Sequence, residues 1–236
     1  MQTLPIHEIG PFAGIPVKMN MMTRRKSITK IDWRLCVIAD VKAAGGRYLP
    51  PLIEESVEAG ATMIQLRAKR LDTEDLFNLC CRIEEVLRGH DVPLVINDRV
   101  DIALACGTEG VHLGQRDLPL KHARALLGKK RIIGISVSTV DEALDAEAGG
   151  ADYLGAGPVF YTDSKKNLPR TLGTEGLKAI RAEVKIPVLA IGGITVERTA
   201  EVAAAGADGI AVISAVWGKD DIAGAVKALL AAFKPG

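Results

Sequence analysis

The stretch Ala-Ala-Gly-Ala-Asp-Gly-Ile-Ala-Val-Ile-Ser at residues 204–214 contains the two signals that decide the fold. A helical pattern ends in small residues and a glycine, and a short apolar run follows at once. Glycine is the usual left-handed cap after a helix, so the chain turns directly into a strand. The same succession appears as EAGATMIQ at 58–65, ACGTEGVH at 105–112 and EAGGADYL at 147–154. Each copy predicts a helix followed by a buried strand.

Eight strands can be placed on this alternation, near 35–39, 62–66, 93–96, 110–113, 131–136, 152–155, 187–191 and 208–213. Their mostly continuous apolar character is typical of parallel strands that are covered on both faces. Helical spacing predicts a helix over 73–88 that Gly89 ends, and Thr139 with Glu142 predicts a capping box that opens a helix over 140–148.

These units, of about 25 residues each, favour a single (β/α)8 TIM barrel, which is an α/β fold. An open doubly wound sheet is less favoured, because no Gly-x-Gly-x-x-Gly follows the first strand. Residues 1–34 differ from the rest: they hold four of the five methionines and a basic cluster at 24–30, without the apolar core of a secretory signal. We therefore expect a poorly ordered leader at 1–34 and one barrel domain at 35–236.

Composition excludes several classes of function. With 30 Lys and Arg against 29 Asp and Glu, the chain has no bulk field to attract nucleic acid or an anionic membrane. A content of 4% aromatic residues argues against a nucleic-acid stacking platform. No apolar stretch approaches the roughly 18 residues of a membrane span. The four cysteines, Cys36, Cys80, Cys81 and Cys106, show no metal spacing, and we interpret them as small buried hydrophobes in a cytoplasmic protein.

Polar residues and glycines follow the predicted strands. The C-terminal ends of barrel strands meet at one mouth, where the active sites of such barrels lie. The residues concerned are Gln65, Arg67, Lys69, Asn97, Asp98, Gln115, Arg116, Asp117, Ser136, the loop 161–166, Gly192, Gly193, Ile213 and Ser214. One aspartate at a strand end more often caps a helix, so their convergence carries the prediction.

These residues sort by chemistry. Gly193 and the backbone at 213–214 follow strands seven and eight, where barrels bind phosphate through backbone N–H groups and a helix N-terminus. Arg67, Lys69 and Lys165 supply cations. Asp98 and Asp117 supply two carboxylates, which together with waters and substrate phosphates are the ligands that Mg²⁺ prefers. The combination suggests a diphosphate bridged by a metal, with ion pairing among the charges as the simpler reading.

His112 is the one histidine inside a predicted strand. We favour a hydrogen-bonded barrel filler over direct catalysis for it. No Ser/His/Asp arrangement or Cys/His cluster is legible in the sequence.

Taken together, the segments resemble the thiamine-phosphate synthase family, also called thiamine-phosphate pyrophosphorylase. The resemblance covers about residues 35–233 and rests on Gln-Leu-Arg-Ala-Lys at 65–69, Ile-Asn-Asp at 96–98, GVHLGQRD at 110–117, IGISVS at 133–138, GPVFYTDSK at 157–165, AIGGI at 190–194 and ADGIAVIS at 207–214. Tyr161 and Ser164 depart from the family, which usually has Pro and Thr there.

The resemblance implies a role for each matching residue. The aminopyrimidine diphosphate would be bound by Gln65, Arg67, Lys69, Asn97, Ser136 and Lys165, of which Arg67, Lys69, Ser136 and Lys165 would act in catalysis. Asp98 and Asp117 would ligate Mg²⁺. The thiazole phosphate would be held by Thr162, Asp163, Ser164, Gly193, Ile213 and Ser214.

The implied reaction couples these two small molecules to thiamine phosphate and pyrophosphate by a dissociative, Mg²⁺-assisted route. It needs no protein nucleophile, and it leaves the oligomeric state open, a homo-oligomer included. Two alternatives stay open: a thiazole tautomerase paralogue, whose pattern has histidine where this chain has Ser138, and a catalytically silent protein that binds thiamine intermediates.

Overall fold

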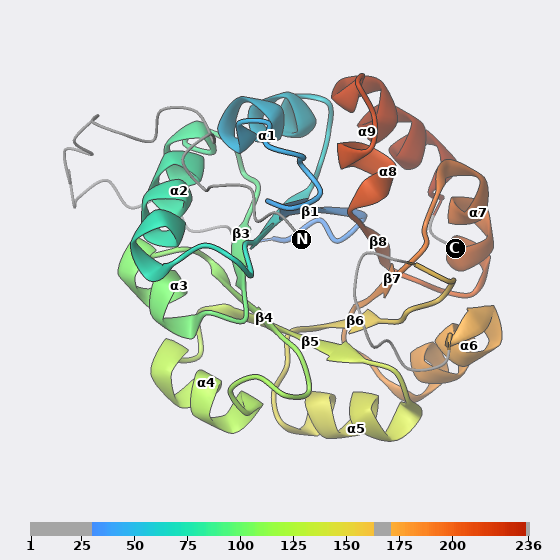
Figure 1. Cartoon of the computed structure of the whole chain (residues 1–236). Coiled ribbons are helices and arrows are strands. Elements are labelled where there is room, and N and C mark those ends of the chain that lie inside the picture. The colour runs from blue at the N-terminus through green and yellow to red at the C-terminus, as the bar shows by residue number, and fades with distance from the viewer. Residues whose placement is uncertain (1–29, 163–170, 235–236) are drawn as a thin grey trace, which may run out of the picture.

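The structure, a computed structural model, describes residues 30–162 and 171–234. Eight parallel strands close into a barrel in sequence order, and β1 pairs with both β2 and β8. Figure 1 shows the helices as a ring around this barrel. The predicted (β/α)8 barrel is confirmed. No helix within the described ranges is long and apolar enough to cross a membrane.

All eight strands lie within one residue of their predicted bounds. They are β1 (Leu35–Asp40), β2 (Met63–Arg67), β3 (Leu94–Asn97), β4 (Gly110–Leu113), β5 (Ile132–Val137), β6 (Tyr153–Ala156), β7 (Val188–Ile191) and β8 (Gly209–Val212). The helices are α1 (Leu49–Glu58), α2 (Thr73–Val86), α3 (Val100–Cys106), α4 (Leu120–Leu127), α5 (Val140–Ala148), α6 (Gly173–Glu183), α7 (Val196–Ala204), α8 (Ser214–Trp217) and α9 (Ile222–Ala232).

Helix α5 occupies its predicted range, but its capping box forms only in part. The Thr139 hydroxyl accepts the Glu142 N–H at 3.2 Å, as predicted. The Glu142 carboxylate accepts the N–H of Ser138 at 2.6 Å and its hydroxyl at 2.9 Å, so the returning bond goes to the residue before the cap. Helix α2 ends at Val86, two residues before the predicted end, and Gly89 adopts the left-handed φ of 96° that was expected of it.

Apolar side chains form two layers, one between the strands and the helices and one inside the barrel. The inner layer comprises Cys36, Ile38, Met63, Val95, Ile132, Tyr153, Leu189 and Ala211. Trp33 packs on this layer, with its ring centroid 5.1 Å from that of Tyr153. Because Trp33 precedes β1, it lies at the N-terminal end of the barrel, opposite the predicted mouth.

Only the last five residues of the predicted leader, 30–34, belong to the part of the chain that the structure describes. Residues 1–29 lie outside that part, whereas Ile31 and Trp33 pack against the barrel interior. The backbone also approaches closely here: a Cβ at Gly209 would lie 1.8 Å from the Trp33 carbonyl oxygen. The cysteines follow their prediction in part, since Cys36 and Cys80 are buried while Cys81 and Cys106 are half-buried.

Candidate active site

A cavity of about 940 Å³, counting the space at its open mouth, lies over the C-terminal ends of the strands. Eleven of the predicted site residues line it, namely Gln65, Arg67, Lys69, Asn97, Asp98, Asp117, Ser136, Thr162, Gly193, Ile213 and Ser214. The other three, Asp163, Ser164 and Lys165, fall outside the described residues. The fold therefore brings these eleven residues together, whereas Gln115 and Arg116, which also follow a predicted strand, are not among the residues that line the cavity.

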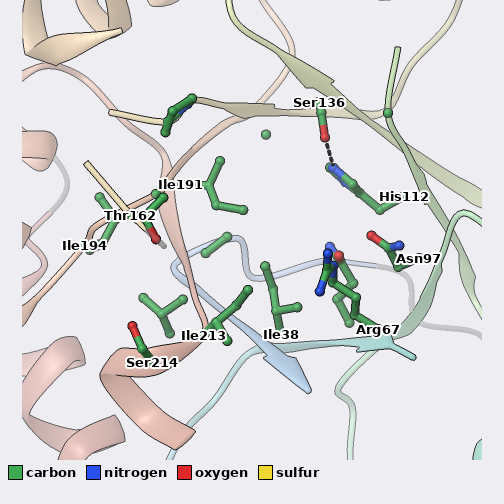
Figure 2. Close-up of a pocket in the computed structure, with 18 of the residues that line it drawn as sticks. Ile38, Arg67, Asn97, His112, Ser136, Thr162, Ile191, Ile194, Ile213 and Ser214 are labelled. Atoms are coloured by element: carbon green, nitrogen blue, oxygen red, sulfur yellow. Dashed lines mark hydrogen bonds between the residues drawn. The ribbon is translucent and has the colours of Figure 1, made fainter. Parts of the chain in front are cut away.

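Polar groups occupy two ends of the cavity, with isoleucines between them (Figure 2). One end carries Arg67, Asn97, His112 and Ser136, the other carries Thr162 and Ser214, and Ile38, Ile191 and Ile213 lie between. An elongated ligand with an apolar middle and a polar group at each end would match this distribution.

Asp98 occupies a special backbone position at the end of β3. Its φ of 63° makes it the one non-glycine residue with positive φ in the described part of the chain. Its N–H donates to the His112 carbonyl at 2.9 Å, which fixes the turn against β4. Left-handed backbone at a non-glycine residue costs free energy and is concentrated at functional sites. The Asp98 carboxylate pairs with Lys69 Nζ at 2.7 Å.

Asp117 lies beside Asp98 from the loop after β4. Its carboxylate accepts the Gly114 N–H at 2.6 Å, so the loop backbone holds it in place. Burial, followed by the hydrogen bond with Asp98, raises the pKa of Asp117 above its ordinary value. A cation held between the two carboxylates would favour the ionised form of Asp117.

This donor set fits Mg²⁺. Within residues 30–162 and 171–234, no group of three His, Cys, Asp or Glu gathers as a metal site. The protein would therefore supply the carboxylates of Asp98 and Asp117, with the remaining positions left to waters and phosphate oxygens. Mg²⁺ is usually bound in this manner, by one or two carboxylates and substrate phosphates.

His112 connects the cavity to the barrel interior. It is 6% exposed, and its Nδ1 lies 2.8 Å from the Tyr153 hydroxyl while its Nε2 lies 2.9 Å from Ser136 Oγ. The predicted hydrogen-bonded filler is therefore what the structure contains, with the addition that the ring also lines the cavity. In a neutral imidazole one nitrogen donates and the other accepts, so the bond at Nδ1 sets the role of Nε2 toward Ser136.

Burial raises the pKa of Tyr153 well above its ordinary value, and the phenol stays protonated. Its ring leaves no room for a side chain on the neighbouring strand, because a Cβ at Gly134 would lie 2.1 Å from its Cζ atom. The hydroxyl beneath His112 is therefore a fixed part of the barrel floor.

The ends of β7 and β8 form the opposite end of the cavity. Gly192 and Gly193 have φ of 95° and 66°, and a Cβ at Gly193 would lie 2.5 Å from the Tyr161 carbonyl oxygen. The short helix α8 begins at Ser214, directly after β8. Glycine backbone followed by a short extra helix is the arrangement with which barrels bind phosphate.

Asp40 is a residue of this region that the sequence analysis missed. It ends β1 directly opposite Arg67 on β2, and its carboxylate pairs with the Arg67 guanidinium. The sequence does carry a signal for it, because Asp40 directly follows the apolar run at 35–39 that predicts the first strand. The apolar middle was also missed, because an isoleucine in a strand carries no mark of facing a ligand.

The comparisons with known proteins agree with one another. The family model described as thiamine monophosphate synthase matches residues 35–216. The thiamine-phosphate synthase of Clostridium novyi is 47% identical over 199 residues, covering 84% of this chain and 98% of that protein. The enzyme of the same name from Moorella thermoacetica is 49% identical over 198 residues, covering 84% and 94%.

A solved structure of a thiamine phosphate pyrophosphorylase from Pyrococcus furiosus superposes with a TM-score of 0.78 at 42% identity, covering 85% of this chain and 95% of that one. The family match thus includes all eight strands and the residues at the mouth of the barrel. The sequence identity of 42–49% to these relatives is well above the level at which only the fold is shared. The chain belongs to the thiamine monophosphate synthase family, and it is an enzyme of the transferase class that acts in thiamine biosynthesis.

Proposed function

We propose that this chain condenses 4-amino-2-methyl-5-(diphosphooxymethyl)pyrimidine with 4-methyl-5-(2-phosphoethyl)thiazole, carboxylated or not, to give thiamine phosphate and pyrophosphate. The observation that carries the proposal is the pairing of Asp98 and Asp117 beside Lys69 and Arg67 at one end of a cavity whose other end is a glycine backbone cradle. A diphosphate with its metal suits the first end, and a phosphate monoester suits the second.

The proposed chemistry is dissociative. The bond between the pyrimidine methylene carbon and the diphosphate oxygen breaks, and both electrons leave with pyrophosphate. The electron-rich aminopyrimidine stabilises the methylene cation, and the thiazole nitrogen then attacks that carbon. No protein nucleophile takes part, so the protein acts through positioning and charge stabilisation.

The chain's own residues serve this reaction in three ways. Arg67 and Lys69 bind the leaving diphosphate, and the sequence predicts that Lys165 joins them. Asn97, Gln65 and Ser136 orient the pyrimidine. The isoleucines between the two ends exclude water from the cation.

Asp98 and Asp117 would hold Mg²⁺. The metal, when bound, supplies Lewis-acid stabilisation of the departing diphosphate. Lys69 Nζ lies 2.7 Å from the Asp98 carboxylate. It is therefore close enough to turn from the carboxylate to a phosphate oxygen when the substrate enters.

The test of this assignment is Asp98→Ala, assayed by pyrophosphate release with both substrates and Mg²⁺. We expect turnover to fall at least about 100-fold, which is the lower end for the loss of one such electrostatic group. The matched control is Asp101→Ala, which removes an exposed carboxylate that pairs with Arg99 at 2.6 Å. The control should keep its activity, and wild-type turnover by the Asp98 variant at limiting Mg²⁺ would contradict the assignment.

A thiazole tautomerase is the second candidate, because the hydrogen bond between His112 and Ser136 joins two groups that can move a proton. It requires no pyrimidine, so isomerisation of the thiazole carboxylate by the protein alone would favour it. Binding of both substrates without either reaction would favour the silent binding protein.

We also propose the cytoplasm as the site of the reaction. All four cysteines are free thiols, and Cys36 is fully buried, with the pKa of its thiol raised by burial to about 12. Free thiols of this kind persist in a reducing compartment.

A further inference from the structure

Asp40 holds a buried charge that the proposed reaction does not use. It is 4% exposed, and it does not belong to the residues that line the cavity. One carboxylate oxygen pairs with Arg67 Nη1, and the other accepts the Ala43 N–H at 2.9 Å. Both oxygens are thus engaged by donors.

The backbone around Asp40 is also fixed. The Val41 N–H donates to the Arg67 carbonyl at 3.0 Å, and the Ala44 N–H donates to the Asp40 carbonyl at 2.9 Å. Asp40 and Arg67 are direct partners in the register of β1 and β2. The carboxylate therefore meets Arg67 from a rigid position.

A carboxylate beside Arg67 weakens the Coulomb attraction of this end of the cavity for an anion, so any help that Asp40 gives to anion binding must come through the geometry of the guanidinium. Arginine is flexible and presents five donors in a planar fork. The Asp40 carboxylate holds the guanidinium at Nη1, which limits its rotation. The N–H groups on Nε and Nη2 can then point toward the cavity.

We propose that Asp40 is a positioning residue that holds the Arg67 guanidinium in the orientation in which it meets the diphosphate of the substrate. This inference rests on the proposed function, because that function places a diphosphate against Arg67. Asp40 itself acts only through Arg67.

The decisive variant is Asp40→Asn. Arg67 and the Ala43 N–H meet different oxygens of the Asp40 carboxylate. In asparagine one of these two positions is an NH2 donor, so one of the two partners loses its acceptor. The side chain keeps its size, so packing changes little. Loss of the fixed fork should lower kcat/KM about 100-fold, the effect expected when a binding group is misplaced by about 1 Å.

The experiment is a double-mutant cycle of Asp40→Asn and Arg67→Ala, followed by pyrophosphate release and by calorimetric binding of magnesium pyrophosphate. If Asp40 acts through Arg67, its substitution should lower both readouts in the wild-type background and change neither in the Arg67→Ala background. Thermal unfolding adds a third readout. Arg67→Ala leaves Asp40 buried without its cation, so adding Asp40→Asn should raise the Tm of that variant.

The control is Asp152→Asn, because Asp152 has the same two kinds of partner at the other end of the barrel. One oxygen of its carboxylate, Oδ2, accepts both the Ile133 N–H at 2.7 Å and Arg124 Nη2 at 2.6 Å. Asp152→Asn should leave both pyrophosphate binding and kcat/KM at the wild-type values.

Equal losses from Asp40→Asn in both backgrounds would overturn the inference, as would wild-type kcat/KM and binding in the single variant. A wild-type protein that binds magnesium pyrophosphate without turning over would refute the proposed function alone, and the cycle would then be read from binding. If the wild-type protein neither binds magnesium pyrophosphate nor turns over, both the proposed function and the role of Asp40 are refuted.

Discussion

Tyr153→Phe tests the hydrogen-bonded barrel floor beneath Ser136. The substitution removes one oxygen atom and keeps the ring, so the packing of Trp33 and the close approach of Gly134 are preserved. What is lost is the hydroxyl that lies 2.8 Å from His112 Nδ1. Tyr153 is 1% exposed, so water cannot take the place of that hydroxyl.

The magnitude follows from this burial. A hydrogen bond removed from a buried group, with its partner left in place, costs about 1–3 kcal/mol. For a domain of this size, each kcal/mol shifts Tm by about 2–4 °C, so Tm should fall by about 2–12 °C. Pyrophosphate release should fall as well, because the bond that fixes the His112 ring against Ser136 is gone.

Denaturant unfolding monitored by circular dichroism measures the free energy of unfolding directly. The control is Tyr48→Phe, in which the same atom is removed from a tyrosine that is 47% exposed and accepts a hydrogen bond from Arg82 at 3.2 Å. That change should stay within about 0.5 kcal/mol of wild type. If the free energy of unfolding of Tyr153→Phe also stayed within about 0.5 kcal/mol of wild type, the hydrogen bond from Tyr153 to His112 would not stabilise the barrel, and the reasoning would be refuted.

Two further substitutions test the two ends of the cavity. Gly193→Ala places a Cβ 2.5 Å from the Tyr161 carbonyl oxygen at a φ of 66°, so it should cost at least about 1–2 kcal/mol and raise KM for the thiazole phosphate more than KM for the pyrimidine diphosphate. Equal effects on both KM values would argue against a phosphate cradle there. The pKa of Asp117 is raised by burial and by Asp98, so folding favours its protonated form. The stability that this gives is fully present below the unfolded pKa of 3.8 and is lost as pH rises through the raised pKa of the folded state. In metal-free buffer at neutral pH, Asp117→Asn should therefore have a higher Tm than wild type, and Mg²⁺ should raise the Tm of wild type only; an unchanged Tm on adding Mg²⁺ to wild type would contradict the proposed metal site.

The barrel could be predicted because each unit carries its own local signal. Glycine caps such as Gly107, with a φ of 77° after α3, mark where a helix ends, and the apolar run after each of them marks the strand. These signals act over a few residues, so one sequence is enough to place them. The convergence of strand ends then follows from the closure of the barrel.

The contacts within the site could not be predicted in the same way. Hydrogen bonds from Tyr153 through His112 to Ser136 cross three strands, and their side-chain directions depend on register. The left-handed backbone at Asp98 has no sequence mark, since aspartate tolerates this conformation in turns but most aspartates do not adopt it. The strand-end rule applied to the first strand would have placed Asp40 at the mouth, but its pairing with Arg67 depends on the register of β1 and β2.

The most direct test of the central claim is to mix the purified protein with Mg²⁺, the aminopyrimidine diphosphate and the thiazole phosphate and to measure pyrophosphate. The account predicts release that requires both organic substrates and Mg²⁺ and that yields one thiamine phosphate for each pyrophosphate. Thiazole isomerisation without pyrophosphate, or binding of both substrates without product, would contradict it.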